Sequence, residues 1–145
     1  MFTTQFILSI GAATIAGYAV GALWYSPFLF LKPWRKALGK TDVDLESNKK
    51  EMPRIMVYGF LNTIATAFAL GIILEIIGVR TLVEYLYVAL FVCFSFIVTT
   101  KFNDLIYESR EPHWSKEPQI LFLISIGYYI ALFLAMALAF WSLRI

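Results

Sequence analysis

The 145-residue sequence has little of what catalytic and metal-binding proteins use most. It contains one cysteine, Cys93, and one histidine, His113. A single cysteine excludes an internal disulfide and a cysteine-rich metal site, and a single histidine excludes every motif that needs two histidines. Because a phosphate-binding glycine loop is missing as well, the sequence predicts no metal site, no cofactor and no enzymatic activity.

Charged residues are also scarce. They make up 15% of the chain, whereas hydrophobic residues make up 60% and aromatic residues 17%. A soluble domain carries about 45–50% apolar and roughly 25% charged residues, and a chain of this size has too much surface to hide such an excess in a core. We therefore expect the lipid bilayer to be the solvent. The sequence shows no broad basic face, so we expect no nucleic-acid partner.

Long segments without charged residues define the expected membrane spans. A helix needs about 20 predominantly apolar residues to cross roughly 30 Å of hydrocarbon. The sequence therefore predicts an all-α fold, an integral membrane four-helix bundle that forms a single transmembrane domain over residues 1–145. The predicted spans are residues 5–26, 54–78, 82–102 and 118–142, and the loops with most charge are 27–53 and 103–117. The third uncharged segment, residues 85–100, is short, so a three-span protein with a re-entrant segment is the alternative.

Prolines and glycines indicate where the spans begin and end. Pro27 disfavours a helical conformation at Ser26 and removes a backbone donor, so the first span is expected to end in this segment. Residues 78–81, which begin with Gly78, are expected to form a tight hairpin between the second and third spans. Pro118 is expected to open the fourth span, where an early helical proline costs little.

The distribution of Lys and Arg predicts the orientation. Ten of the twelve lie in or beside the loops 27–53 and 103–117, which leaves Arg80 and Arg144 on the other side. Cytoplasmic loops of membrane proteins carry the excess of basic residues. We therefore predict a multi-pass protein of the cell (inner) membrane, with both charged loops in the cytoplasm and both the N- and C-termini outside it.

The first loop has the pattern of an interfacial helix. Apolar residues recur at near-helical spacing between positions 28 and 38, and basic side chains beside them can reach anionic lipid headgroups. Those basic residues are Lys32, Arg35 and Lys36. The segment is expected to end at Gly39, with a second helical piece beginning at Thr41. A docking site for a partner protein is the alternative interpretation of this loop.

Small residues recur every four positions in three of the predicted spans. They are Ala13, Gly17 and Gly21 in the first, Thr63, Ala67 and Gly71 in the second, and Gly127, Ala131, Ala135 and Ala139 in the fourth. Such stripes let helix backbones approach closely in lipid, where burying apolar surface gives no drive to association. Packing within one chain and association between chains both need these residues, so both interpretations stay open.

Five polar residues are predicted to lie at a similar depth in the membrane. They are Tyr18, Asn62, Ser95, Ser125 and Tyr128. At about 1.5 Å per residue, each lies roughly 9–15 Å below the cytoplasmic ends of the spans. If these side chains face one another, they form a polar layer inside the bundle. That layer either joins the helices by hydrogen bonds or lines a pocket for a small ligand.

The segment from Gly21 to Pro27 resembles the opening signature of the domain-of-unknown-function family 1761, small prokaryotic membrane proteins of about this length. The residues that carry the resemblance are Trp24, Tyr25, Ser26, Pro27 and Trp34, then Asn103, Glu108 with Arg110, and Gly127 with Tyr128. The chain departs from the family pattern at Leu31, where glycine is expected, and at Ser125 and Tyr129, where more polar residues are usual. The resemblance implies a four-span membrane protein and no particular activity.

Together these features favour a non-enzymatic membrane module, which forms a homo-oligomer or serves as an accessory subunit of a membrane complex. Its partners are then the bilayer and either itself or another membrane protein. One alternative is a carrier or binder of a small, largely apolar molecule that uses the polar layer within the bundle. Another is a membrane-embedded enzyme, which would depend on Asn103, Glu108 and His113.

Overall fold

The computed structural model describes residues 3–40, 42–108 and 116–143, and for residues 42–48 and 108 it describes the backbone alone. The described residues form helices and no strands. Four of these helices are long and apolar enough to cross a membrane: Thr4–Trp24, Lys49–Ile77, Leu82–Tyr107 and Lys116–Leu143. The predicted all-α fold with four long apolar helices is therefore confirmed.

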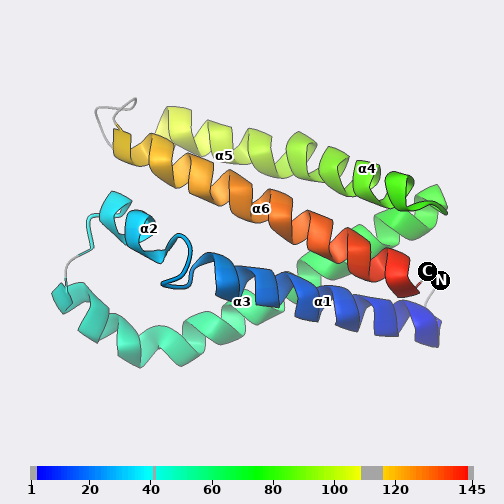
Figure 1. The fold of residues 1–145 in the computed structure, drawn as a ribbon, viewed down its shortest axis with the longest axis horizontal. Helices are drawn as coiled ribbons and strands as arrows, with labels where there is room; N and C mark the ends of the chain where they lie inside the picture. Colours follow the sequence, from blue (N-terminus) through cyan, green and yellow to red (C-terminus); the bar gives the residue numbers. More distant parts are fainter. Residues whose placement is uncertain (1–2, 41, 109–115, 144–145) are drawn as a thin grey trace.

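The helices follow one another in the order shown in Figure 1. They are α1 (Thr4–Trp24), α2 (Leu31–Ala37), α3 (Asp42–Ile77), α4 (Leu82–Val92), the π-helical segment η1 (Cys93–Val98), α5 (Thr99–Asn103), the π-helical segment η2 (Asp104–Glu108) and α6 (Lys116–Leu143). The α6 helix is central, because it packs against α1, α2, α4 and α5, while α3 packs mainly against α1.

The helix α1 begins and ends where local hydrogen bonds replace the helical ones. At its start, the Thr3 hydroxyl accepts a hydrogen bond from the Phe6 backbone at 3.2 Å. Thr3 is therefore an N-cap residue. At its end, the Ser26 hydroxyl donates to the Leu23 carbonyl at 2.6 Å. The helix ends two residues before the predicted position because the ring of Pro27 already restricts Ser26.

The short helix α2 ends at a glycine, as the sequence indicates. Gly39 has a φ of 66°, a left-handed conformation that costs glycine little. Its N–H donates to the Lys36 carbonyl at 3.1 Å, and the N–H of Lys40 donates to the Arg35 carbonyl at 3.2 Å. These two hydrogen bonds form a Schellman motif, which satisfies carbonyls that the end of a helix leaves free.

The next helix differs from the prediction, because α3 continues through Pro53 without a break. The sequence placed the end of a loop at this proline, with a span from residue 54. Proline inside a helix removes one hydrogen bond and bends the axis, and α3 is bowed in Figure 1. The predicted loop 27–53 therefore contains α2 and the first turns of α3.

The third span also continues beyond its predicted end at residue 102. Helical structure runs from Leu82 through η1 and α5 to Glu108, the last residue of η2. The Thr99 and Thr100 hydroxyls donate to the carbonyls of Ser95 and Phe96, at 2.8 Å and 2.6 Å. Hydroxyl groups that bond to the preceding turn often accompany bent or widened helices. Of the predicted loop 103–117, residues 109–115 lie outside the described residues.

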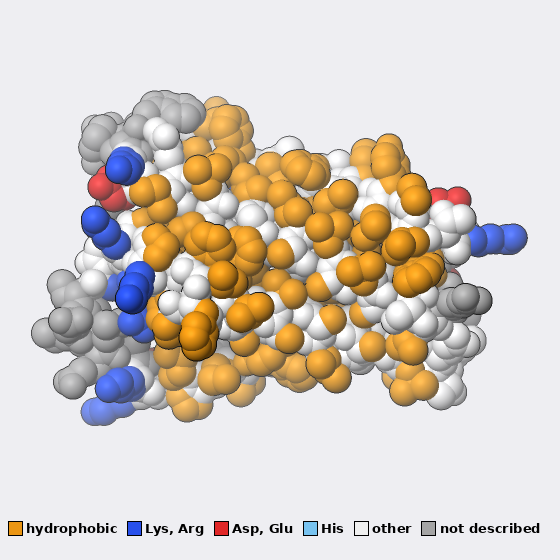
Figure 2. All heavy atoms as spheres, in the orientation of Figure 1, with side chains coloured by type: hydrophobic (Ala, Val, Ile, Leu, Met, Phe, Trp, Pro, Cys, Tyr) orange, Lys and Arg blue, Asp and Glu red, His pale blue; other side chains and the backbone are white. Residues whose placement is uncertain are grey.

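The core of the bundle lies where α1, α3, α4 and α6 meet. Its fully buried apolar side chains include Phe6, Ala13, Ala67, Leu70, Leu74, Tyr85, Ala89, Met136 and Phe140. Outside this core, apolar side chains cover the middle of the molecule, and Lys and Arg side chains gather at one end (Figure 2). We call the end that carries α2 the basic end. The start of α1 and the end of α6 meet at the opposite end, where Gln5 Nε2 donates to the Leu143 carbonyl at 2.6 Å.

Candidate functional site

The end of α1 is attached to α6 by one aromatic side chain. Trp24 Nε1 donates a hydrogen bond to the Ile124 carbonyl at 3.1 Å. The indole ring lies directly over Gly127, where a β-carbon would stand 2.7 Å from Cζ2 and 3.1 Å from Cη2 of Trp24. A side chain at position 127 would therefore collide with the ring. Two residues of the family motif, distant in the sequence, form one contact.

Around this contact, aromatic rings from α1, α2 and α6 pack edge to face or at a tilt. The Tyr25 ring lies 5.3 Å from the rings of both Trp34 and Tyr128, measured between centroids. The Tyr128 and Tyr129 rings lie 5.0 Å apart. Such tilted pairs are favourable beyond the area they bury. We call Trp24, Tyr25, Trp34, Tyr128 and Tyr129 the aromatic cluster.

A hydrogen bond between two hydroxyl groups connects the aromatic cluster with α6. The Ser125 hydroxyl forms a hydrogen bond with the phenol of Tyr25, which lies in the connection between α1 and α2. Burial, followed by the neighbouring phenols of Tyr128 and Tyr129, raises the pKa of Tyr25 to about 12. The Tyr25 phenol is therefore neutral at physiological pH, and it serves as a hydrogen-bonding group rather than as a base.

Ser125 also lines a pocket beside α6. This cavity, of about 290 Å³, lies between α6 and the segment α5–η2, and we call it the α5–α6 pocket. Its lining residues are Lys101, Asp104, Leu105, Pro118, Leu121, Phe122 and Ser125. Lys101 Nζ and Asp104 Oδ2 form an ion pair of 2.9 Å, with each side chain about one third exposed (37% and 35%). The pocket thus combines an apolar floor with one donor, one carboxylate and one hydroxyl.

The wall of the α5–α6 pocket includes η2, a π-helical segment. Segments of this kind are rare, and they occur frequently at functional sites because they redirect side chains. Within the described part of the chain, no group of three His, Cys, Asp or Glu side chains could hold a metal ion. The described residues that line the pocket can form hydrogen bonds, an ion pair and apolar contacts.

The five polar residues predicted to form one layer do not all meet. Ser125 and Tyr128 lie together beside Tyr25. Tyr18 lies apart from them, with its hydroxyl donating to the Met56 carbonyl at 3.4 Å. The side chains of Asn62 and Ser95 are exposed on the outer surface. Of the predicted polar layer, Ser125 and Tyr128 therefore lie together between α1 and α6, whereas Asn62 and Ser95 face outward.

The predicted packing glycines lie at close helix contacts within the monomer. A β-carbon on Gly17 would stand 2.6 Å from Met136 Cε, one on Gly21 would stand 3.4 Å from Tyr128 Oη, and one on Gly71 would stand 3.1 Å from Phe140 Cζ. The small residues of α6 differ, because Ala131, Ala135 and Ala139 are only partly buried.

The remaining motif residues lie at the basic end or near it. Pro27 follows the cap of α1, and Asn103 is exposed at the end of α5. Glu108 ends η2, and its side chain lies outside the description, as do Arg110 and His113. Lys101 and Asp104 are not among the site residues predicted from the sequence. Their opposite charges, three positions apart at the end of a helix, are the signal that could have found them.

Comparison with known proteins identifies a family. The family model described as "Protein of unknown function (DUF1761)" matches residues 8–141. The matched range contains every residue of the aromatic cluster and of the α5–α6 pocket. No curated protein and no solved structure matches the chain.

Proposed function

For this chain, which belongs to the DUF1761 family of proteins of unknown function, we propose the role of a non-enzymatic membrane module that associates through α3. Its partner is either a second copy of the chain or another membrane protein, which it then serves as an accessory subunit. Four helices that are long and apolar enough to cross a membrane support the membrane part of this proposal.

The observation that carries the proposal is the outward position of Asn62. Every residue from Lys49 to Asn62 is exposed, including Ile55 at 53%, Tyr58 at 64% and Leu61 at 54%. Counted from Arg54 at about 1.5 Å per residue, Asn62 lies about 12 Å along the helix from the charged end. An amide at that depth in hydrocarbon lacks water, and a facing helix can supply its hydrogen bonds.

Three of the small residues support this choice of surface. Gly17, Gly71 and Gly127 lie against side chains of the same chain, so these three positions are occupied within the monomer. The segment from Lys49 to Asn62 is exposed, and Asn62 presents a polar group at membrane depth. Association through α3 would therefore explain why the amide of Asn62 faces outward, which packing within the chain does not explain.

The decisive experiment replaces the amide and measures the subunit count. Asn62→Leu keeps the size of the side chain and removes its hydrogen-bonding groups. Native mass spectrometry in lipid particles at native abundance should show the association constant falling by about 3- to 30-fold, the range expected for one interhelical hydrogen bond. Ser95→Ala, which removes another outward polar group, should leave it unchanged. A wild-type monomer with no bound protein would overturn the proposal.

The orientation forms part of the same proposal. The basic end supports a cytoplasmic location of α2 in the cell (inner) membrane, with both chain termini outside the cytoplasm. On α2, Lys32 and Lys36 are exposed and Arg35 is half-buried. They would bind anionic lipid headgroups, since a basic helix at the membrane surface attracts them.

The α5–α6 pocket supports a second candidate function, the binding of a small, largely apolar molecule. Its floor of Leu105, Leu121 and Phe122 suits an apolar body, and Ser125 with the ion pair suits a polar end. If the protein retains such a molecule, Ser125→Ala should remove the corresponding mass from the native spectrum. Tyr25→Phe, which removes the same hydrogen bond but keeps the Ser125 hydroxyl, should retain it. Retention by Ser125→Ala would exclude the pocket as the binding site.

A further inference from the structure

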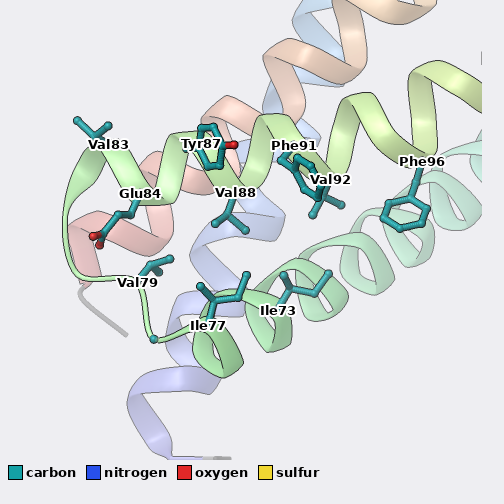
Figure 3. A pocket seen from close by; sticks show the side chains of 11 residues that line it. Ile73, Ile77, Val79, Val83, Glu84, Tyr87, Val88, Phe91, Val92 and Phe96 are labelled. Carbon is teal, nitrogen blue, oxygen red and sulfur yellow. The ribbon is translucent and has the colours of Figure 1, made fainter.

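The helices α3 and α4 follow each other in the sequence, yet they diverge and leave a groove between them. The groove has a volume of about 720 Å³, and Figure 3 shows side chains from both helices around it. We call it the α3–α4 groove. Its lining residues are Ile73, Ile77, Gly78, Val79, Val83, Glu84, Tyr87, Val88, Phe91, Val92 and Phe96.

The turn between the two helices holds the groove open. Gly78 ends α3 with a φ of 73°, and Thr81 begins α4 with a capping box. From this turn, α4 directs Tyr85 and Ala89 into the core against α6. The opposite face of α4 therefore points away from the core, and it leaves Tyr87 and Phe91 exposed at 69% and 58%.

The groove is long enough to hold an extended hydrocarbon chain. From Val83 to Phe96 it runs for about 20 Å. A hydrocarbon chain is only roughly 4 Å wide at van der Waals contact, so it can lie along the groove.

The residues that line the groove favour a hydrocarbon chain over a second helix as its occupant. Helices associate closely in lipid through small residues, whereas the walls of the groove carry large branched and aromatic side chains such as Ile77, Phe91 and Phe96. These side chains would keep the backbone of a second helix at a distance. A flexible chain can follow such an uneven apolar surface without that constraint.

The turn at the end of the groove carries one acidic and one basic side chain, Glu84 and Arg80. The Glu84 carboxylate is engaged by the turn itself, because its Oε2 accepts hydrogen bonds from the N–H groups of Arg80 and Thr81 at 2.7 Å and 2.9 Å. Arg80 does not line the groove itself, but it follows the lining residue Val79, and its side chain is exposed. Arg is the residue that best matches the geometry of a phosphate group. It lies at the depth where the headgroup of a lipid meets the ends of spanning helices.

From these observations we infer that the α3–α4 groove binds one acyl chain of an anionic glycerophospholipid, whose phosphate lies at Arg80. The inference is independent of the association through α3, because Asn62 does not line the groove. A lipid held in this way fills the opening between α3 and α4 and becomes part of the outer surface of the bundle at that end.

The test uses the full chain in lipid particles that contain equal amounts of phosphatidylglycerol and phosphatidylcholine, followed by native mass spectrometry. Wild type should retain phosphatidylglycerol. Ile77→Trp places a bulky ring in the groove and should abolish the retained lipid. Ile76→Trp is the matched control, because Ile76 is exposed at 68% and does not line the groove. Arg80→Gln should reduce the preference for phosphatidylglycerol about fivefold, the effect of one basic residue near a membrane surface.

Two outcomes would overturn the inference. Equal lipid retention by Ile77→Trp and Ile76→Trp would show that the lipid binds elsewhere. A dimer that Ile77→Trp converts to a monomer would show that a second copy of the chain occupies the groove. Because Asn62→Leu leaves the groove intact, lipid retention in that variant separates this inference from the proposed association.

Discussion

The indole of Trp24 lies over α6 at the one position where Gly127 leaves the backbone uncovered, and a β-carbon there would stand 2.7 Å from the ring. The ring cannot easily move aside, because its Nε1 is held by the Ile124 carbonyl at 3.1 Å. This contact attaches the end of α1 to the central helix. It also gives a structural role to Trp24 and Gly127, two of the residues that carry the resemblance to the family.

We therefore expect Gly127→Ala to destabilise the protein by about 1–3 kcal/mol, the range for forcing an extra methyl group into a packed site. Thermal unfolding in detergent measures the change. The matched control is Gly11→Ala, since a β-carbon on Gly11 meets nothing within 4 Å. That variant should be stabilised by up to about 1 kcal/mol, because alanine favours the helix more than glycine does. Equal melting temperatures for the two variants would contradict the proposed contact.

A substitution at Gly17 tests whether the cost of an added β-carbon depends on its distance from neighbouring atoms or on how rigidly those atoms are held. A β-carbon on Gly17 would stand even closer to its neighbours, 2.6 Å from Met136 Cε and 2.9 Å from Leu132 Cδ1. Both atoms are the ends of flexible side chains, and methionine in particular adapts to new neighbours. Gly17→Ala should therefore destabilise the protein less than Gly127→Ala, by roughly 1 kcal/mol. A larger loss at Gly17 would show that α1 and α6 cannot adjust at their crossing.

The sequence was sufficient to predict the four long apolar helices, because charge is excluded from hydrocarbon whatever the helices pack against. It also indicated the helix ends at Gly39 and Gly78, where the left-handed backbone favours glycine. It missed the passage of α3 through Pro53. Proline lowers helix stability locally, yet neighbouring residues can carry the helix past it with a bend.

Which face of each helix points into the bundle could not be predicted in the same way. In lipid, an apolar side chain is accommodated on either side of a helix, so periodicity does not separate inside from outside. The outward positions of Asn62 and Ser95, and the inward position of Ser125, depend on how α6 meets its neighbours. That arrangement is set by contacts such as Trp24 on Gly127, which join residues far apart in the sequence.

The phenol of Tyr25 gives the protein a pH dependence at high pH. Its pKa is raised from 10.0 to about 12, first by burial. The folded state therefore holds this proton more tightly than the unfolded state does, and the stability that it contributes below pH 10 is lost as the pH rises towards 12. Thermal unfolding between pH 9 and pH 11 should show a smaller loss of stability in Tyr25→Phe than in wild type. An identical loss in both proteins would contradict the role of this phenol.

The orientation can be tested with two exposed positions at opposite ends of the molecule. Lys40 follows α2 at the basic end, and Arg80 lies in the turn between α3 and α4. Because basic residues are retained on the cytoplasmic side, a membrane-impermeant maleimide added to intact cells should label Arg80→Cys and not Lys40→Cys. Permeabilised cells should show labelling of both variants.

The wild-type chain is the control for this labelling experiment. Its one cysteine, Cys93, is fully buried in the core, so the wild type should stay unlabelled in intact and in permeabilised cells. Labelling of Lys40→Cys in intact cells, with Arg80→Cys protected, would reverse the orientation. The phosphate site at Arg80 would then face the cytoplasmic leaflet, and α2 would contact the outer one. The same two variants therefore decide which leaflet supplies the lipid that we place in the α3–α4 groove.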